Sequence, residues 1–184
     1  MDLQIAFKAL HINDADDSIA CALNLLDDDD DDPEVSVHIS TILEHAMERD
    51  PDNEMLLHAY IKAQSTLISA RKMVHLVQRL YNMNQDAATH HNLFVACWQA
   101  QHYDDMRQHI LQYQHHHGQN TPELTDAAYF LMEAGFTTDA INLYQHLIKE
   151  EPYIPDHLSN LSLCYHLKGD LLRAAKYKQL ATTI

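Results

Sequence analysis

Histidine is the residue type in this chain with the most chemical potential, because 15 of the 184 residues are histidines. An imidazole can bind a metal ion or carry a proton near neutral pH. The H-E-x-x-H pattern, which places two imidazoles on one helical face, is absent. His115, His116 and His117 are consecutive, so on a helix their rings point in three directions. We therefore predict surface or partly packed histidines, with no metal site and no cofactor.

The cysteines offer little more chemistry. Cys21, Cys97 and Cys164 are odd in number and widely spaced, which indicates neither a disulfide framework nor a Cys-type zinc site. Cys97 and Cys164 lie within apolar segments, so we expect packed, inert thiols. A catalytic thiol also needs a base in contact with it, and His166 is too close to Cys164 in sequence to face it from the same helix. The sequence predicts that the protein is not an enzyme.

Six consecutive carboxylates, at residues 27–32, precede Pro33. A calcium-binding loop needs oxygen ligands at alternating positions, with a glycine that allows the sharp turn. This run has no glycine and no spaced terminal glutamate. We predict a solvated loop between helices. Weak contact with a cation or a basic partner is the alternative.

Composition excludes several classes of function. The formal net charge is −15 with neutral histidine, and so acidic a surface repels nucleic acids and anionic membranes. Only three glycines are present, so the glycine-rich nucleotide-binding motifs cannot occur. No run of about 18 apolar residues and no basic N-terminal segment leading into an apolar one appears. We predict no nucleic-acid partner, no membrane insertion and a cytoplasmic location.

An internal repeat organises the elements that must position any site. Gly135 and Gly169 are 34 residues apart, as are Ala140 and Ala174, and Gln101 falls at the same turn one period earlier. Each unit reads as an apolar helix, a short polar turn and a second apolar helix. Helices of about 13 residues cannot each bury an apolar stripe alone, so pairs must stack on further pairs. The predicted fold is all-α, an α-solenoid of about five antiparallel helix pairs.

The expected organisation is a single repeat domain over residues 1–184, in which residues 1–17 form an N-terminal capping helix. The predicted repeats are about 18–52, 53–86, 87–120, 121–154 and 155–184. Within them, polar breaks and prolines predict helices near 2–12, 15–27, 34–49, 54–65, 69–82, 87–100, 103–116, 122–134, 137–150, 155–168 and 170–182.

These residues resemble the tetratricopeptide repeat (TPR) family over residues 18–182, most strongly in 121–182. That family places small residues where the paired helices approach closely, a large residue late in the second helix and a proline at the end of the repeat. Ala128, Ala140, Tyr144 and Pro152 occupy such positions. The segment 44–53 resembles the end of the family's second helix, whereas Gln101 stands where the turn glycine is usual. The resemblance implies a TPR-like superhelix.

In TPR domains, the first helix of each pair lines a concave groove that holds a peptide. We expect Trp98 and Tyr129 to be the main anchors, because aromatic side chains give a large contact area for few frozen rotamers. Packing of both residues between helices is the alternative. Carried over by the 34-residue register, the expected groove residues are Leu57, Ile61, Gln64, His91, Val95, Trp98, Thr125, Tyr129, Met132, Ser159, Leu163 and His166, with Glu133 at its margin.

The sequence thus predicts a non-enzymatic protein–protein interaction module, an adaptor, scaffold or assembly factor that binds a partner segment in the groove. Arg107 is the only basic residue between Arg79 and Lys149, so the expected ligand is apolar, basic or both rather than a free carboxylate. A homodimer is a further alternative. A second hypothesis is an acidic inhibitor or immunity-type protein that masks a basic partner. A third is a histidine-dependent enzyme or metal-dependent regulator.

Overall fold

The computed structural model describes residues 33–65, 67–118 and 122–183, and in these residues it contains nine α-helices and no strand. Every end of these helices lies within one residue of its predicted position. The predicted helices 2–12 and 15–27, the aspartate run and Cys21 lie outside the described residues. The helices are α3 (Pro33–Arg49), α4 (Glu54–Gln64), α5 (Ala70–Met83), α6 (Ala87–Gln99), α7 (Tyr103–His117), α8 (Glu123–Glu133), α9 (Thr137–Glu150), α10 (Pro155–Leu167) and α11 (Leu171–Thr183).

Local side chains explain where several helices begin. The side-chain oxygen of Asn53 accepts a hydrogen bond from the backbone N–H of Leu56 at 3.1 Å and caps α4. Asp86 does the same for α6, since its Oδ1 lies 2.7 Å from the N–H of Thr89. This bond is the largest of several effects that lower the pKa of Asp86. Pro155 opens α10, where a missing N–H costs nothing.

The 34-residue period appears in the backbone as one turn used three times. Gly135 and Gly169 have φ angles of 85° and 84°, and Gln101 has φ 60° at the equivalent place. At each turn a backbone N–H reaches the carbonyl five residues earlier, at 2.9 Å after Gln101, 2.8 Å after Gly135 and 2.9 Å after Gly169. This arrangement ends a helix with a residue in the left-handed region. Gln101 adopts that region despite its side chain.

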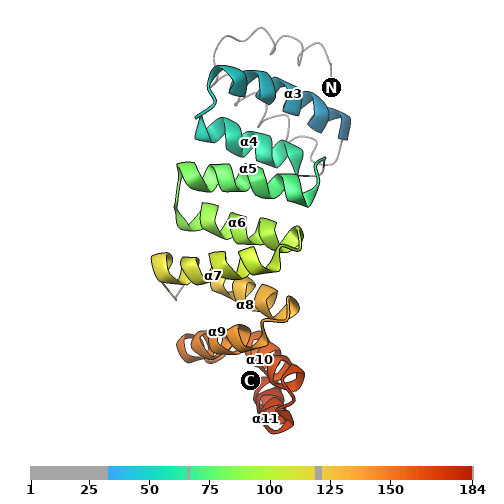
Figure 1. Cartoon of the computed structure of the whole chain (residues 1–184). Coiled ribbons are helices and arrows are strands. Elements are labelled where there is room, and N and C mark those ends of the chain that lie inside the picture. The colour runs from blue at the N-terminus through green and yellow to red at the C-terminus, as the bar shows by residue number, and fades with distance from the viewer. Residues whose placement is uncertain (1–32, 66, 119–121, 184) are drawn as a thin grey trace. The chain divides into compact units, whose positions relative to one another are not determined.

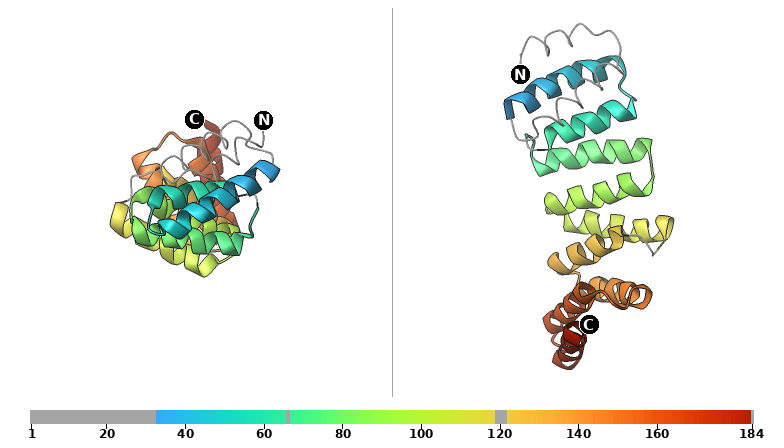
Figure 2. Two further views of the ribbon diagram at one scale, coloured as in Figure 1. Left: turned by 90° about the horizontal axis from the view of Figure 1, so that it is seen from above. Right: turned by 180° about the vertical axis from the view of Figure 1, so that it is seen from behind.

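The described helices fall into two compact units, divided between Ala96 and Cys97. In the first unit α3, α4 and α5 pack in sequence order as antiparallel neighbours (Figures 1 and 2). The rings of Tyr81 and His90 lie 4.6 Å apart and join α5 to α6. The apolar core between α3 and α4 consists of Ile39, Leu43, Ala46, Leu56, Ala59 and Ala63.

The second unit contains α7 to α11. Here α8 packs on α9, and α10 packs on both α9 and α11 (Figure 1). The largest fully buried side chains of this unit are those of Tyr113 and Tyr144. Ser162 in α10 donates a hydrogen bond to the carbonyl of Ala174 in α11 at 2.7 Å, which ties the two helices together. Among the described helices, none has the length and apolarity that a bilayer crossing requires.

Candidate functional site

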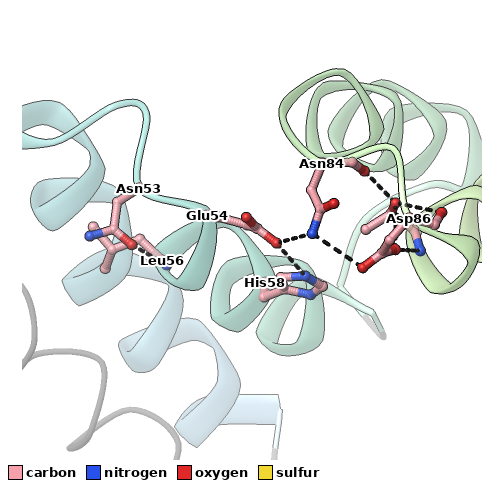
Figure 3. A network of polar contacts seen from close by, with 7 residues as sticks. Asn53, Glu54, Leu56, His58, Asn84 and Asp86 are labelled. Carbon is pink, nitrogen blue, oxygen red and sulfur yellow. Dashed lines mark hydrogen bonds and ion pairs between the residues drawn. The ribbon is translucent and has the colours of Figure 1, made fainter.

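A polar network in the first unit brings several titratable residues together where α4 begins (Figure 3). The side-chain amide of Asn84 donates to Glu54 at 2.9 Å and to Asp86 at 3.2 Å, and His58 Nε2 lies 3.8 Å from Glu54 Oε1. Both carboxylates have structural partners, because Asp86 caps α6 and Glu54 sits in the first turn of α4. The network therefore fastens the turn between α5 and α6 to the start of α4.

The two described cysteines are packed in the interior, as the sequence predicts. Both thiols are buried, and burial raises the pKa of Cys97 and of Cys164 to about 11. A thiol with this pKa is almost entirely protonated at neutral pH and is a poor nucleophile. In the part of the chain that the structure describes, no three His, Cys, Asp or Glu residues form a group able to hold a metal ion.

Two histidines correct the prediction that these residues are exposed or partly packed. His90 and His157 are fully buried. His157 Nε2 lies 3.3 Å from the hydroxyl of Thr125, and its ring centroid is 6.3 Å from that of Tyr144. Burial lowers the pKa of His157, so the neutral imidazole is favoured. The reason for the error is that a neutral imidazole packs between helices as an amphipathic side chain.

The expected groove residues of the first unit are all covered to some degree. Leu57 and Gln64 are buried, whereas Ile61 and Val95 are half-buried. His91 is half-buried too, and its ring meets that of Phe94 edge-on at 4.8 Å. Leu57 and Gln64 therefore belong to the helix packing, which removes them from the proposed ligand surface.

In the second unit the two expected anchors, Trp98 and Tyr129, differ in solvent exposure. Trp98 is half-buried and stacks on Phe130 with ring centroids 4.4 Å apart. Tyr129 is 41% exposed on α8. Met132 is buried, and the hydroxyl of Thr125 is within hydrogen-bonding distance of His157 of α10. The periodicity identifies a helical face, but it does not separate the solvent-facing positions of that face from those against the next helix.

Three of the expected residues come together at one cavity. Ser159, Leu163 and His166 line a hollow of ≈ 610 Å³ between α10 and α11, and Leu163 is 43% exposed there. Ser162 completes the contribution of α10. The wall formed by α11 consists of Leu171, Ala174, Ala175, Lys178, Ala181 and Thr182, none of which is among the expected groove residues. The cavity is therefore mostly apolar, with one ammonium group and one imidazole.

Lys178 is the charged residue among those at this cavity that sequence reasoning missed. The signal is present, because Lys178 lies 34 residues after Tyr144, at the place where the TPR pattern has a large residue. The TPR resemblance assigns the groove to the first helix of each pair, so it does not point to α11. Within the described residues, no carboxylate lies at ion-pair distance from Lys178, whereas Arg173 pairs with Asp170 at 3.5 Å.

The architecture matches known helical solenoids. YrrB, a TPR protein with an unusual peptide-binding site, superposes with a TM-score of 0.73 at 14% identity, over 96% of this chain and 90% of that one. A crystal structure of MamA gives 0.72 at 14% identity, over 89% and 90% of the two chains. Neither a family model nor a curated protein matches the sequence. At this identity the likeness concerns the fold, and the fold is a TPR-like α-solenoid, as the sequence predicts.

Proposed function

We propose that this protein is a non-enzymatic interaction module that acts as an adaptor, scaffold or assembly factor by holding a segment of a partner protein. The observation that carries the proposal is the exposure of large apolar side chains at equivalent positions of consecutive repeats. Tyr129 and Leu163 are 34 residues apart, and they are 41% and 43% exposed. Single exposed apolar residues are common, but apolar side chains that recur at one position of successive repeats and adjoin an aromatic cluster are typical of a binding surface.

The surroundings of these residues fit the same role. Trp98 and Phe130 stack next to Tyr129, whose ring lies 6.0 Å from that of Phe130. Aromatic clusters on rigid helices provide the contact area that concentrates binding energy in a few residues. The peptide-binding site of YrrB supports a peptide ligand for this fold, although the sequences share only 14% identity. The partner segment is accordingly expected to offer apolar side chains to α8 and α10.

The test is a pull-down with untagged protein from native lysate, in which partners of the wild type are compared with those of Tyr129→Ala and Leu163→Ala. We expect each substitution to weaken capture of the main partner at least tenfold. Tyr153→Ala is the matched control, because Tyr153 is 78% exposed on the loop before α10. Trp98→Ala is a second probe, with circular dichroism to confirm folding. Partners retained by the Tyr129, Leu163 and Trp98 variants alike would move the binding site away from this surface.

The dependence of partner capture on ionic strength distinguishes this proposal from the acidic-inhibitor hypothesis. Contacts made by Tyr129 and Leu163 are apolar, so capture should survive an ionic strength that screens exposed charges. Masking of a basic partner by the net charge of −15 should instead fail under the same wash. Loss of every partner in high salt, with no effect of Tyr129→Ala, would favour the inhibitor.

A further inference from the structure

We propose that the cavity between α10 and α11 binds an amphipathic α-helix of a partner protein, in the register that α10 itself takes on α8 and α9, with a carboxylate of that helix against Lys178. This inference rests on the proposed function and names the class of ligand. It adds the wall of α11 to the binding surface, which already includes Leu163 on the α10 side of the same cavity.

The preceding repeat shows what fits such a surface. Ala140, Tyr144 and Leu147 of α9 are buried, because α9 packs against both α8 and α10, and the ring of Tyr144 lies against His157 of α10. The residues 34 positions later are Ala174, Lys178 and Ala181, which line the cavity. The α10–α11 pair therefore presents a surface equivalent to the one on which the α8–α9 pair holds α10. An apolar surface of this shape is complementary to another helix packed ridge into groove.

Polar contacts that hold α10 have counterparts at the cavity. The hydroxyl of Thr125 lies 3.3 Å from His157, and the amide of Gln145 donates to the hydroxyl of Tyr165 at 2.8 Å. One period later stand Ser159 and Gln179, a hydroxyl and an amide of the same kinds, and both are exposed. A docked helix would thus find the same two polar positions that fix the register of α10.

The main difference between the two surfaces is a charge. Tyr144 faces His157 with ring centroids 6.3 Å apart, but the equivalent of Tyr144 in α11 is Lys178. A helix that covers Lys178 removes its ammonium from water, which is favourable only if a carboxylate compensates the charge. The residue of the ligand that corresponds to His157 is therefore expected to be Asp or Glu. Neutral residues at that place would leave the ammonium unpaired.

The surrounding field has the sign that attracts such a ligand. Residues 155–184 carry Lys168, Arg173, Lys176 and Lys178 against Asp156 and Asp170, although the whole chain has a net charge of −15. Asp170 is engaged by Arg173, and the ammonium of Lys176 lies 5.7 Å from the ring centroid of Tyr177. A local excess of positive charge raises the association rate of an acidic segment. For this cavity the ligand is acidic, in contrast to the basic partner that total charge suggests.

The experiment uses the full chain and three labelled peptides that copy residues 153–169, measured by fluorescence anisotropy. One peptide keeps His157, one carries His157→Glu and one carries His157→Lys. We expect the Glu peptide to bind at least tenfold more tightly than the Lys peptide. The protein variant Lys178→Glu should reverse that order, while the matched control Lys176→Glu should change both affinities less than about threefold, because Lys176 does not line the cavity.

Three results would overturn the proposal. One is the absence of binding by any peptide, and another is an affinity for the Glu peptide that Lys178→Glu leaves unchanged. The third is self-association of the wild-type chain in light scattering that Lys178→Glu abolishes, since it would make a second copy the occupant. Failure here leaves the proposed function standing if Tyr129→Ala still loses its partner. If the Tyr129→Ala and Leu163→Ala variants still capture every partner while the peptides bind as expected, the proposed function fails and the cavity proposal stands.

Discussion

The α8–α9 and α10–α11 pairs are built on one sequence period but differ in what covers them. Both pairs turn through a glycine with φ near 85°, at Gly135 and Gly169. In α9 the residues Ala140, Ile141, Leu143, Tyr144 and Leu147 are buried, whereas in the described part of α11 only Ala174 is. The apolar stripe of such a helix is thus buried by the next helix and not by its own pair alone. The residue type differs accordingly, since the covered position holds Tyr144 and the equivalent exposed position holds Lys178.

The largest expected difference in stability is between alanine substitutions at the two equivalent positions, 144 and 178. Tyr144 is fully buried, so Tyr144→Ala should lower the free energy of unfolding by about 3–5 kcal/mol. Lys178→Ala, at an exposed place, should change it by less than about 0.5 kcal/mol. Urea denaturation followed by circular dichroism measures both. Equal effects would show that α11 is packed as tightly as α9, and would contradict the contrast between the two pairs.

A smaller effect is expected at the turns. Gln101 adopts φ 60°, where a side chain is unfavourable, so Gln101→Gly should raise the free energy of unfolding by about 0.5–1 kcal/mol. Gly169→Ala should lower it by about 1 kcal/mol, and this cost is conformational because no atom lies within 4 Å of the added Cβ. Thermal melts of the two variants should therefore shift in opposite directions. A lower melting temperature for Gln101→Gly would contradict the role assigned to this residue.

The third effect depends on pH and distinguishes α10 as a covered helix. Burial lowers the pKa of His157 below its ordinary value, so the unfolded chain binds a proton more readily than the folded one. Stability should therefore fall as the pH drops through about 6.5, the pKa of an unperturbed histidine, and go on falling until the folded pKa is passed. His157→Gln should make this part of the profile less steep, with a remaining slope from His109, whose pKa burial also lowers. The control substitution is His166→Gln, at an exposed position of the same helix.

The helices could be predicted from the sequence because their signals are local. Proline at 51 and 152, the turn glycines and the 34-residue period fix the breaks, and the described helices end within one residue of the expected positions. The expected site residues do not share one environment, and their role in binding stays a prediction. Ser159, Leu163 and His166 do meet at one cavity, but Leu57, Gln64 and Met132 are buried. Which face of a helix is covered depends on neighbours that a sequence period does not specify.

Electrostatics is the other property that whole-chain composition predicts poorly. A net charge of −15 describes the chain as a whole, but recognition depends on the charges within about a Debye length of the site. Around the α11 wall the balance of charge is positive, since Lys168, Arg173, Lys176 and Lys178 stand within eleven consecutive residues that contain one carboxylate, Asp170. Counting charge repeat by repeat, rather than over the whole chain, is enough to identify this difference from the amino-acid sequence.

The buried thiols also allow the rate of local opening to be measured by chemical labelling. Because Cys97 and Cys164 are enclosed and carry a pKa of about 11, an alkylating reagent reaches them only when α6 or α10 transiently separates from its neighbours. In a Cys21→Ser background, the two labelling rates read by mass spectrometry would time these openings separately in the native protein. A ligand helix seated on α10 should slow the labelling of Cys164 and leave that of Cys97 unaltered.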